Sequence, residues 1–157
     1  MLLAGLGLML AGRLHAQTLT IVHSFSPTLL TFPPSNDDGA GPQGLILSFN
    51  CLYGTAKLGG ESGRGAVFKL NTDGSGFATL HSFSPNASDL DPSNSDGALP
   101  FGGLVISSNM VYGTAYSGGS GANGTVFTEG LLLWRVLCRS GRIHPASPTE
   151  YTGCSPV

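Results

Sequence analysis

Positive charge is scarce in this chain, and the scarcity argues against one class of function. Of 157 residues only seven are Lys or Arg, against nine Asp or Glu, so the formal net charge is −2. Proteins that bind nucleic acid neutralise its phosphates with clustered Lys and Arg. Three of the seven basic residues are grouped beyond residue 130, namely Arg135, Arg139 and Arg142. No basic stripe can be drawn on the rest, and we expect no nucleic-acid partner.

Cysteine is also rare, and the number of cysteines is odd. The chain has only Cys51, Cys138 and Cys154. Small exported scaffolds that depend on disulfides carry more cysteines, in even number. Cys51 lies in an apolar run and is predicted to be a small buried apolar residue. Cys138 and Cys154 could pair with each other, and their spacing matches no zinc motif. The three cysteines therefore carry little weight for a functional prediction.

Long apolar runs are missing except at the N-terminus. Leu2 to Gly12 is an uncharged apolar run of signal-peptide length, shorter than the ~20 residues that a membrane-spanning helix needs. Leu14-His15-Ala16 follows, and the small Ala16 suits the position before a cleavage site. The prediction is a signal peptide at 1–16 and a secreted or cell-surface protein; the alternative is a buried hydrophobic strand or helix. We expect no transmembrane segment after signal removal.

Glycine, in contrast, is abundant. The chain contains 24 Gly and 10 Pro, while only 10% of its residues are charged. Helical domains are usually richer in Glu, Lys and Arg than this and poorer in Gly. Glycine supplies the positive φ that tight turns require, so many short strands joined by turns would produce this composition.

Most of the chain consists of two copies of one pattern. His-Ser-Phe-Ser-Pro at 23–27 recurs at 81–85, an offset of 58. Further blocks recur in the same order: Asp38-Gly39-Ala40 as Asp96-Gly97-Ala98 and then, at an offset of 59, Tyr53–Ala56 as Tyr112–Ala115, Gly59-Gly60 as Gly118-Gly119, and Gly65 to Phe68 as Gly124 to Phe127. This self-similarity predicts two β repeats within 17–128, with copies at about 23–80 and 81–128. Residues 129–157 form an atypical tail, for which disorder is one interpretation.

Each copy contains short apolar runs bounded by turn residues, which is typical of strands. In the first copy the runs are Leu45–Ser48, Cys51–Thr55, Ala66–Leu70 and Phe77–Phe83. Phe49-Asn50 and Asp73-Gly74 are positions for tight hairpin turns. In the last run, Phe77, Thr79, His81 and Phe83 are expected to share one face. The predicted fold is all-β, with antiparallel four-stranded blade-like repeats: a β-propeller-like, incomplete arrangement of about two blades.

The order of the runs leaves the second blade one strand short. Its third strand is expected to end near Thr128, and Leu19 to Phe25 matches the fourth-strand pattern. We therefore predict that this N-terminal segment completes the second blade. Propellers have about 4–8 blades, so two blades imply either self-association through open sheet edges or a piece of a longer array.

The combined pattern resembles a known family. Leu-Tyr-Gly-Thr-Ala at 52–56, Gly59-Gly60, Gly-x-Val-Phe-Lys-Leu at 65–70, Asp73-Gly74 and Leu-His-Ser-Phe at 80–83 are similar to the GloVer tandem repeat of exported bacterial proteins. The resemblance covers roughly residues 18–128. It implies export and a propeller-like repeat, usually in more copies with a C-terminal sorting or anchoring segment. The family has no established activity to carry over, and after Thr128 the chain departs from its pattern.

The polar residues of the repeat have a structural and a chemical interpretation. His23 and His81 could form a metal or catalytic pair, but a residue repeated in each copy usually serves the repeat's own packing. Ser24 and Ser82 lack the Gly-x-Ser-x-Gly context of a nucleophile. The loops with Asp37, Asp38, Asp89, Asp91, Asn94 and Asp96 could bind Ca²⁺, although their spacing does not fit an EF-hand; such residues also simply make turns. We assign no catalytic, metal or cofactor residue.

These observations favour an exported, non-catalytic repeat module for binding or surface display. Its partner would be a protein or a polysaccharide at the cell surface. One alternative is a glycan-active enzymatic propeller, in which Asp38 and Asp96 would converge on one pocket. The other is a non-functional gene fragment, which the atypical tail suggests.

Overall fold

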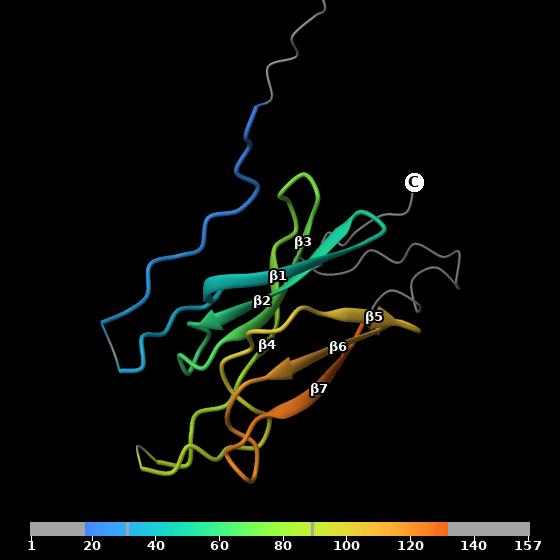
Figure 1. Cartoon of the computed structure of the whole chain (residues 1–157). Helices are drawn as coiled ribbons and strands as arrows, with labels where there is room; N and C mark the ends of the chain where they lie inside the picture. The colour runs from blue at the N-terminus through green and yellow to red at the C-terminus, as the bar shows by residue number, and fades with distance from the viewer. Residues whose placement is uncertain (1–17, 31, 89, 132–157) are drawn as a thin grey trace, which may run out of the picture.

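The computed structural model describes residues 18–30, 32–88 and 90–131, and this part of the chain is all-β (Figure 1). It contains seven strands and no helix: β1 (Ala40–Ser48), β2 (Cys51–Leu58), β3 (Ala66–Asn71), β4 (Ala78–Ser82), β5 (Val105–Ser107), β6 (Met110–Ala115) and β7 (Thr125–Gly130). One sheet has four strands in the order β1-β2-β3-β4, and the other has three in the order β5-β6-β7. All strand pairs are antiparallel. The predicted fold class, an incomplete blade-like β structure, is therefore confirmed.

The first sheet follows the predicted runs closely. Phe49-Asn50 joins β1 to β2 as a tight turn, in which Phe49 has a φ of 52°. Asp73-Gly74 lies in the turn between β3 and β4, and Gly74 has a φ of 87°. The Asp73 carboxylate accepts the Ser75 N–H at 2.9 Å, which is the way a short Asp side chain stabilises a turn. Local turn chemistry thus sets the order of the strands.

The two sheets are built with the same register. Tyr53 on β2 lies opposite Lys69 on β3, and Tyr112 on β6 lies opposite Thr128 on β7. Tyr112 and Thr128 each lie 59 residues after Tyr53 and Lys69, and 59 is the repeat offset in the sequence. The second sheet is a three-stranded counterpart of β1-β2-β3. No fourth strand pairs with β7 in the described part of the chain.

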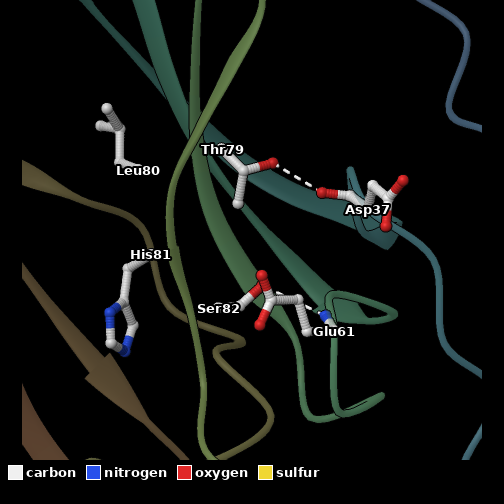
Figure 2. Close-up of a pocket in the computed structure, with 6 residues that line it drawn as sticks. All are labelled: Asp37, Glu61, Thr79, Leu80, His81 and Ser82. Carbon is white, nitrogen blue, oxygen red and sulfur yellow. Dashed lines mark hydrogen bonds between the residues drawn. The ribbon is translucent and has the colours of Figure 1, made fainter.

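The expected alternation along β4 is wrong, because a bulge interrupts the pairing. Val67 lies opposite His81, whereas its neighbour Phe68 lies opposite Thr79, so Leu80 is the extra residue. A bulge changes the direction of the side chains that follow it. Thr79 therefore points to one side of the strand while Leu80 and His81 point to the other, as Figure 2 shows.

The main hydrophobic core lies between the two sheets. Its buried members are Val67, Phe83, Leu104, Val111 and Ala115, with Ile46, Tyr53, Leu80, Ile106, Phe127 and Leu131 packed around them. Burying a Val, Leu or Phe side chain contributes about 1.5–3 kcal/mol. A second cluster, on the opposite face of the first sheet, contains Ala56, Phe68 and Leu70 with Phe25, Leu52 and Phe77.

The N-terminal segment does not occupy its predicted place. Leu19 to Phe25 forms no strand and does not pair with β7. It lies instead against the first sheet, where His23 stacks on Phe77 at 3.9 Å and Phe25 meets Phe68 edge-on at 5.2 Å. The prediction of a fourth strand for the second sheet within one chain is thus wrong. Aromatic packing with the nearer sheet holds the segment there.

Cys51 and the ends of the chain also carried predictions from the sequence. Cys51 is buried, as predicted, with 1% of its surface exposed. It is nevertheless disulfide-bonded, so it is not the free apolar thiol that the sequence suggested. The signal peptide at 1–16, Cys138, Cys154 and most of the tail lie outside the described residues. Within the described part, no helix has the length and apolarity to span a membrane.

The position of Tyr53 at the inter-sheet core predicts a pH effect. Burial raises the pKa of the Tyr53 phenol above its ordinary value of 10.0. The unfolded chain would lose this proton first, so the native state loses stability as the pH rises from 10 through the raised pKa. We expect a late tyrosinate phase in an ultraviolet absorbance titration, and Tyr53→Phe should remove it. A late phase that survives in Tyr53→Phe would contradict the assignment.

Candidate functional site

The repeated His and Asp residues meet in each copy, and the Asp carboxylate binds the backbone. In the second copy Asp96 accepts the Ser84 N–H through both oxygens at 3.1 Å. His81 Nε2 lies 2.7 Å from the same carboxylate. In the first copy Asp38 accepts the Ser26 N–H at 2.8 Å. Each carboxylate therefore ties the chain after the His-Ser-Phe motif to its own Asp-Gly loop.

The first copy has the looser His–Asp contact. His23 Nε2 lies 3.5 Å from Asp38, beyond good hydrogen-bond length, and one Asp38 oxygen is buried with no hydrogen-bond partner. In this copy the His23 ring also stacks on Phe77, with the two ring planes 6° apart.

An asparagine completes each network. Asn36 donates its amide N–H groups to the carbonyls of Ser26 and Gly39 at 2.9 and 2.8 Å. Its amide oxygen accepts the N–H groups of Gly39 and Gly60 at 2.9 and 3.1 Å. One buried side chain thus holds three backbone segments together.

The second copy repeats these contacts residue for residue. Asn94 donates to the Ser84 and Gly97 carbonyls at 3.0 and 2.7 Å. It accepts the N–H groups of Gly97 and Gly119 at 2.8 and 2.7 Å. Sequence reasoning singled out the Asp-Gly steps and the glycine pairs, and it named Asn94 only as a candidate Ca²⁺ ligand. It missed Asn36 and the way both asparagines bridge backbone segments. The readable signal was Ser-Asn-x-Asp-Gly at 35–39 and 93–97.

The first glycine of each Gly-Gly pair leaves room for the asparagine oxygen to approach the backbone. Gly59 and Gly118 have φ values of 69° and 74°. A Cβ at Gly59 would lie 2.4 Å from Asn36 Oδ1, and one at Gly118 would lie 2.5 Å from Asn94 Oδ1. These glycines serve the repeat's own network, as expected for loop glycines.

A hollow of about 280 Å³ lies over β4, next to the second network. Its lining comprises Asp37, Glu61, Thr79, Leu80, His81 and Ser82 (Figure 2). Binding sites for small molecules typically have about 300–1,000 Å³. Thr79 and Ser82 point toward the side of Asp37 and Glu61, whereas Leu80 and His81 point the opposite way. The strand divides the polar groups, so they do not converge on one bound molecule.

A catalytic interpretation would combine Ser82 with His81, or Asp38 with Asp96. Ser82 Oγ accepts the Glu61 N–H at 3.2 Å and points away from His81, so Ser82 and His81 are not arranged as a nucleophile and its base. Asp38 and Asp96 hold separate networks, and neither lines the hollow.

The acidic loops are held as turns. The Asp91 carboxylate accepts the Ser93 N–H at 3.0 Å, and bonds from Ser93 hold the pKa of Asp91 below its ordinary value. Within residues 18–30, 32–88 and 90–131, no three His, Cys, Asp or Glu side chains are grouped as a metal site would need. Asp89, another candidate Ca²⁺ ligand, lies outside those ranges.

Comparison with known proteins adds no relative to this description: no family model matches the chain, and neither a curated protein nor a solved structure is similar to it.

Proposed function

We propose that the chain is an exported, non-catalytic β-repeat module that binds or displays a partner at the cell surface. The observation that carries the proposal is the use of the shared polar residues. Asp38 and Asp96 bind backbone N–H groups at the same place in the two copies, and Asn36 and Asn94 do the same. Polar side chains that bind the chain's own backbone in every copy are typical of a structural repeat.

The resemblance to GloVer repeats supports the exported part of the proposal. So does the apolar run at 2–12, followed by Leu14-His15-Ala16. The partner is expected to be a surface protein or a polysaccharide. Exposed aromatic residues suit such contacts, and Tyr116 and Phe101 form an edge-on pair at 5.7 Å, with 73% and 45% of their surfaces exposed.

Fractionation and pulldown test this proposal. The whole chain, expressed in a bacterium with its own N-terminus, should be recovered outside the cytoplasm and shortened by about the predicted 16 residues. The secreted chain should then bind to cell-envelope or polysaccharide fractions, and Tyr116→Ser should weaken that binding while Leu30→Ser leaves it unchanged. A folded chain that stays in the cytoplasm and binds neither fraction would overturn the proposal.

Replacing the network carboxylate separates a structural role from a catalytic one. We expect Asp96→Asn to lower the free energy of unfolding by about 1.5–3 kcal/mol, because a charged acceptor of the Ser84 N–H and the His81 ring is lost. Urea denaturation measures this loss. Asp91→Asn, at an exposed turn, is the matched control and should cost much less. An Asp96→Asn chain of normal stability that abolished a measured glycan hydrolysis would instead support the enzymatic alternative.

A further inference from the structure

Residues in equivalent positions of the two sheets differ sharply in exposure. Val67 on β3 is fully buried against the second sheet, whereas its counterpart Val126 on β7 is 81% exposed. Tyr53 packs into the inter-sheet core, while its counterpart Tyr112 is 41% exposed. The face that the first sheet turns toward the second is therefore repeated on the second sheet, where nothing in the described chain covers it.

On the opposite face of the first sheet the difference in exposure is reversed: here the residues of the second sheet are buried and their counterparts on the first sheet are exposed. Leu104, just before β5, is 6% exposed because it packs against the first sheet. Its counterpart Leu45 on β1 is 58% exposed. Ile106 packs on the same core, and its counterpart Leu47 is 59% exposed. The β1 side of this face thus carries an uncovered copy of the surface that the second sheet uses, while Phe25 and Phe77 cover Phe68 on the same face.

From these two faces we infer that a second copy of this chain docks head to tail. The exposed face of sheet β5-β6-β7, which carries Val105, Tyr112 and Val126, would meet the first sheet of the next copy. The contact there is with the exposed β1 residues Leu45 and Leu47. The contact repeats the interface that already joins the two sheets within one chain. We expect the two surfaces to fit because residues in the equivalent positions pack together around Val67 and Leu104 within one chain.

The N-terminal segment supplies the missing fourth strand in this arrangement. Phe83, which follows β4, packs edge-on against Phe127 at 5.2 Å. Phe25 packs against Phe68 at the same 5.2 Å, and the interplanar angles are 75° and 73°. Phe25 thus lies on the first sheet as Phe83 lies on the second. In the head-to-tail arrangement, the residues before Phe25 would therefore form the fourth strand of the preceding sheet.

The register of that strand follows from the pair β3–β4. Ala66 lies opposite Ser82, and Val67 lies opposite His81. Shifted by the repeat offsets, Thr125 of one copy lies opposite Ser24 of the next, and Val126 lies opposite His23. The open edge of β7 is then paired, which removes an exposed row of backbone N–H and C=O groups.

Head-to-tail contacts use two different surfaces, so they close into a ring or continue as a filament. Propeller rings contain about 4–8 blades, which corresponds to about two to four copies of a chain with two sheets. This inference does not depend on the proposed binding function, because it concerns only the covering of the two faces.

Native mass spectrometry and light scattering of the whole chain test it directly. We expect a defined species of two or more copies over about a hundredfold range of protein concentration. Val126→Asp and Leu45→Asp should each reduce the mass to that of one chain. Leu30→Asp, at a fully exposed loop position, is the matched control and should leave the assembly intact. Circular dichroism checks that each variant folds.

Mixing the two disrupted variants gives the sharper test. Val126→Asp retains an intact Leu45 face, and Leu45→Asp retains an intact Val126 face, so an equal mixture should form a 1:1 pair. A symmetric contact between like faces would not be restored by mixing. A folded wild-type chain that remains a monomer at every concentration would overturn the inference, even if neither variant folds. A monomer whose β7 amides are protected from hydrogen exchange would also overturn it and would indicate coverage of the face by residues 132–157.

Discussion

Gly59→Ala is expected to lower the free energy of unfolding by about 3 kcal/mol or more, a large fraction of the roughly 5–15 kcal/mol that stabilises a typical domain. Gly59 has a φ of 69°, a conformation that costs an L-residue about 1–2 kcal/mol. The new Cβ would also lie 2.4 Å from Asn36 Oδ1 and 2.7 Å from the Ala40 nitrogen. Asn36 cannot move away, because its oxygen holds the Gly39 and Gly60 N–H groups.

Gly41→Ala is the matched control for this effect. Gly41 has a similar φ of 64°, but nothing lies within 4 Å of a Cβ at that position. We expect Gly41→Ala to cost only about 1–2 kcal/mol, the backbone contribution alone. Urea denaturation of both variants measures the difference. If both variants lost the same free energy of unfolding, the close approach of Asn36 to Gly59 would not contribute to stability.

The second copy provides an internal repetition of the experiment. A Cβ at Gly118 would lie 2.5 Å from Asn94 Oδ1 and 2.7 Å from the Gly97 carbonyl carbon. Gly118→Ala should therefore destabilise the chain much as Gly59→Ala does. If the asparagine network stabilised only one copy, Gly59→Ala and Gly118→Ala would lower the free energy of unfolding by unequal amounts.

The strands of this protein were predictable because local chemistry determines them. Leu45–Ser48 and Cys51–Thr55 are apolar runs on either side of a two-residue turn, and both fall within β1 and β2. The Asp73-Gly74 turn fixes the next hairpin in the same way. The bulge at Leu80 was not predictable from alternation, since it depends on how β4 meets Val67 and Phe68.

The candidate site was only half predictable. The pairing of His81 with Asp96 follows two motifs that recur together, but the sequence spacing does not show that they touch. The bridging role of Asn94 was missed because an Asn among Asp residues in a loop suggests a Ca²⁺ ligand or an ordinary turn residue. Only the folded chain shows that its amide joins Ser84, Gly97 and Gly119.

The fourth strand of the second sheet was wrongly placed for a related reason. Sequence similarity shows that Leu19 to Phe25 has the character of a β4 strand, and the contact of Phe25 with Phe68 repeats that of Phe83 with Phe127. What similarity cannot show is which sheet receives the strand. The segment precedes the first sheet as β4 precedes the second, so chain order carries Phe25 to the first sheet.

The other large expected effect is that of Phe83→Ala, with a loss of about 3–5 kcal/mol in the free energy of unfolding. Phe83 is 1% exposed at the centre of the inter-sheet core, among Val67, Leu104 and Val111. Both sheets lose packing when its ring is removed. The cavity cannot be filled without moving one sheet relative to the other, so most of the cost should remain. Thermal or urea unfolding, followed by circular dichroism, measures the loss.

Phe25→Ala is the control, because Phe25 makes the same edge-on contact with only one sheet behind it. In a single chain it is half-buried, and its removal should cost clearly less than removal of Phe83. The difference between the two variants then depends on what covers Leu45 and Leu47. If copies dock head to tail, the cost of Phe25→Ala should rise toward that of Phe83→Ala as the protein concentration rises. A ratio that does not change with concentration would show that Phe25 stays at an uncovered face.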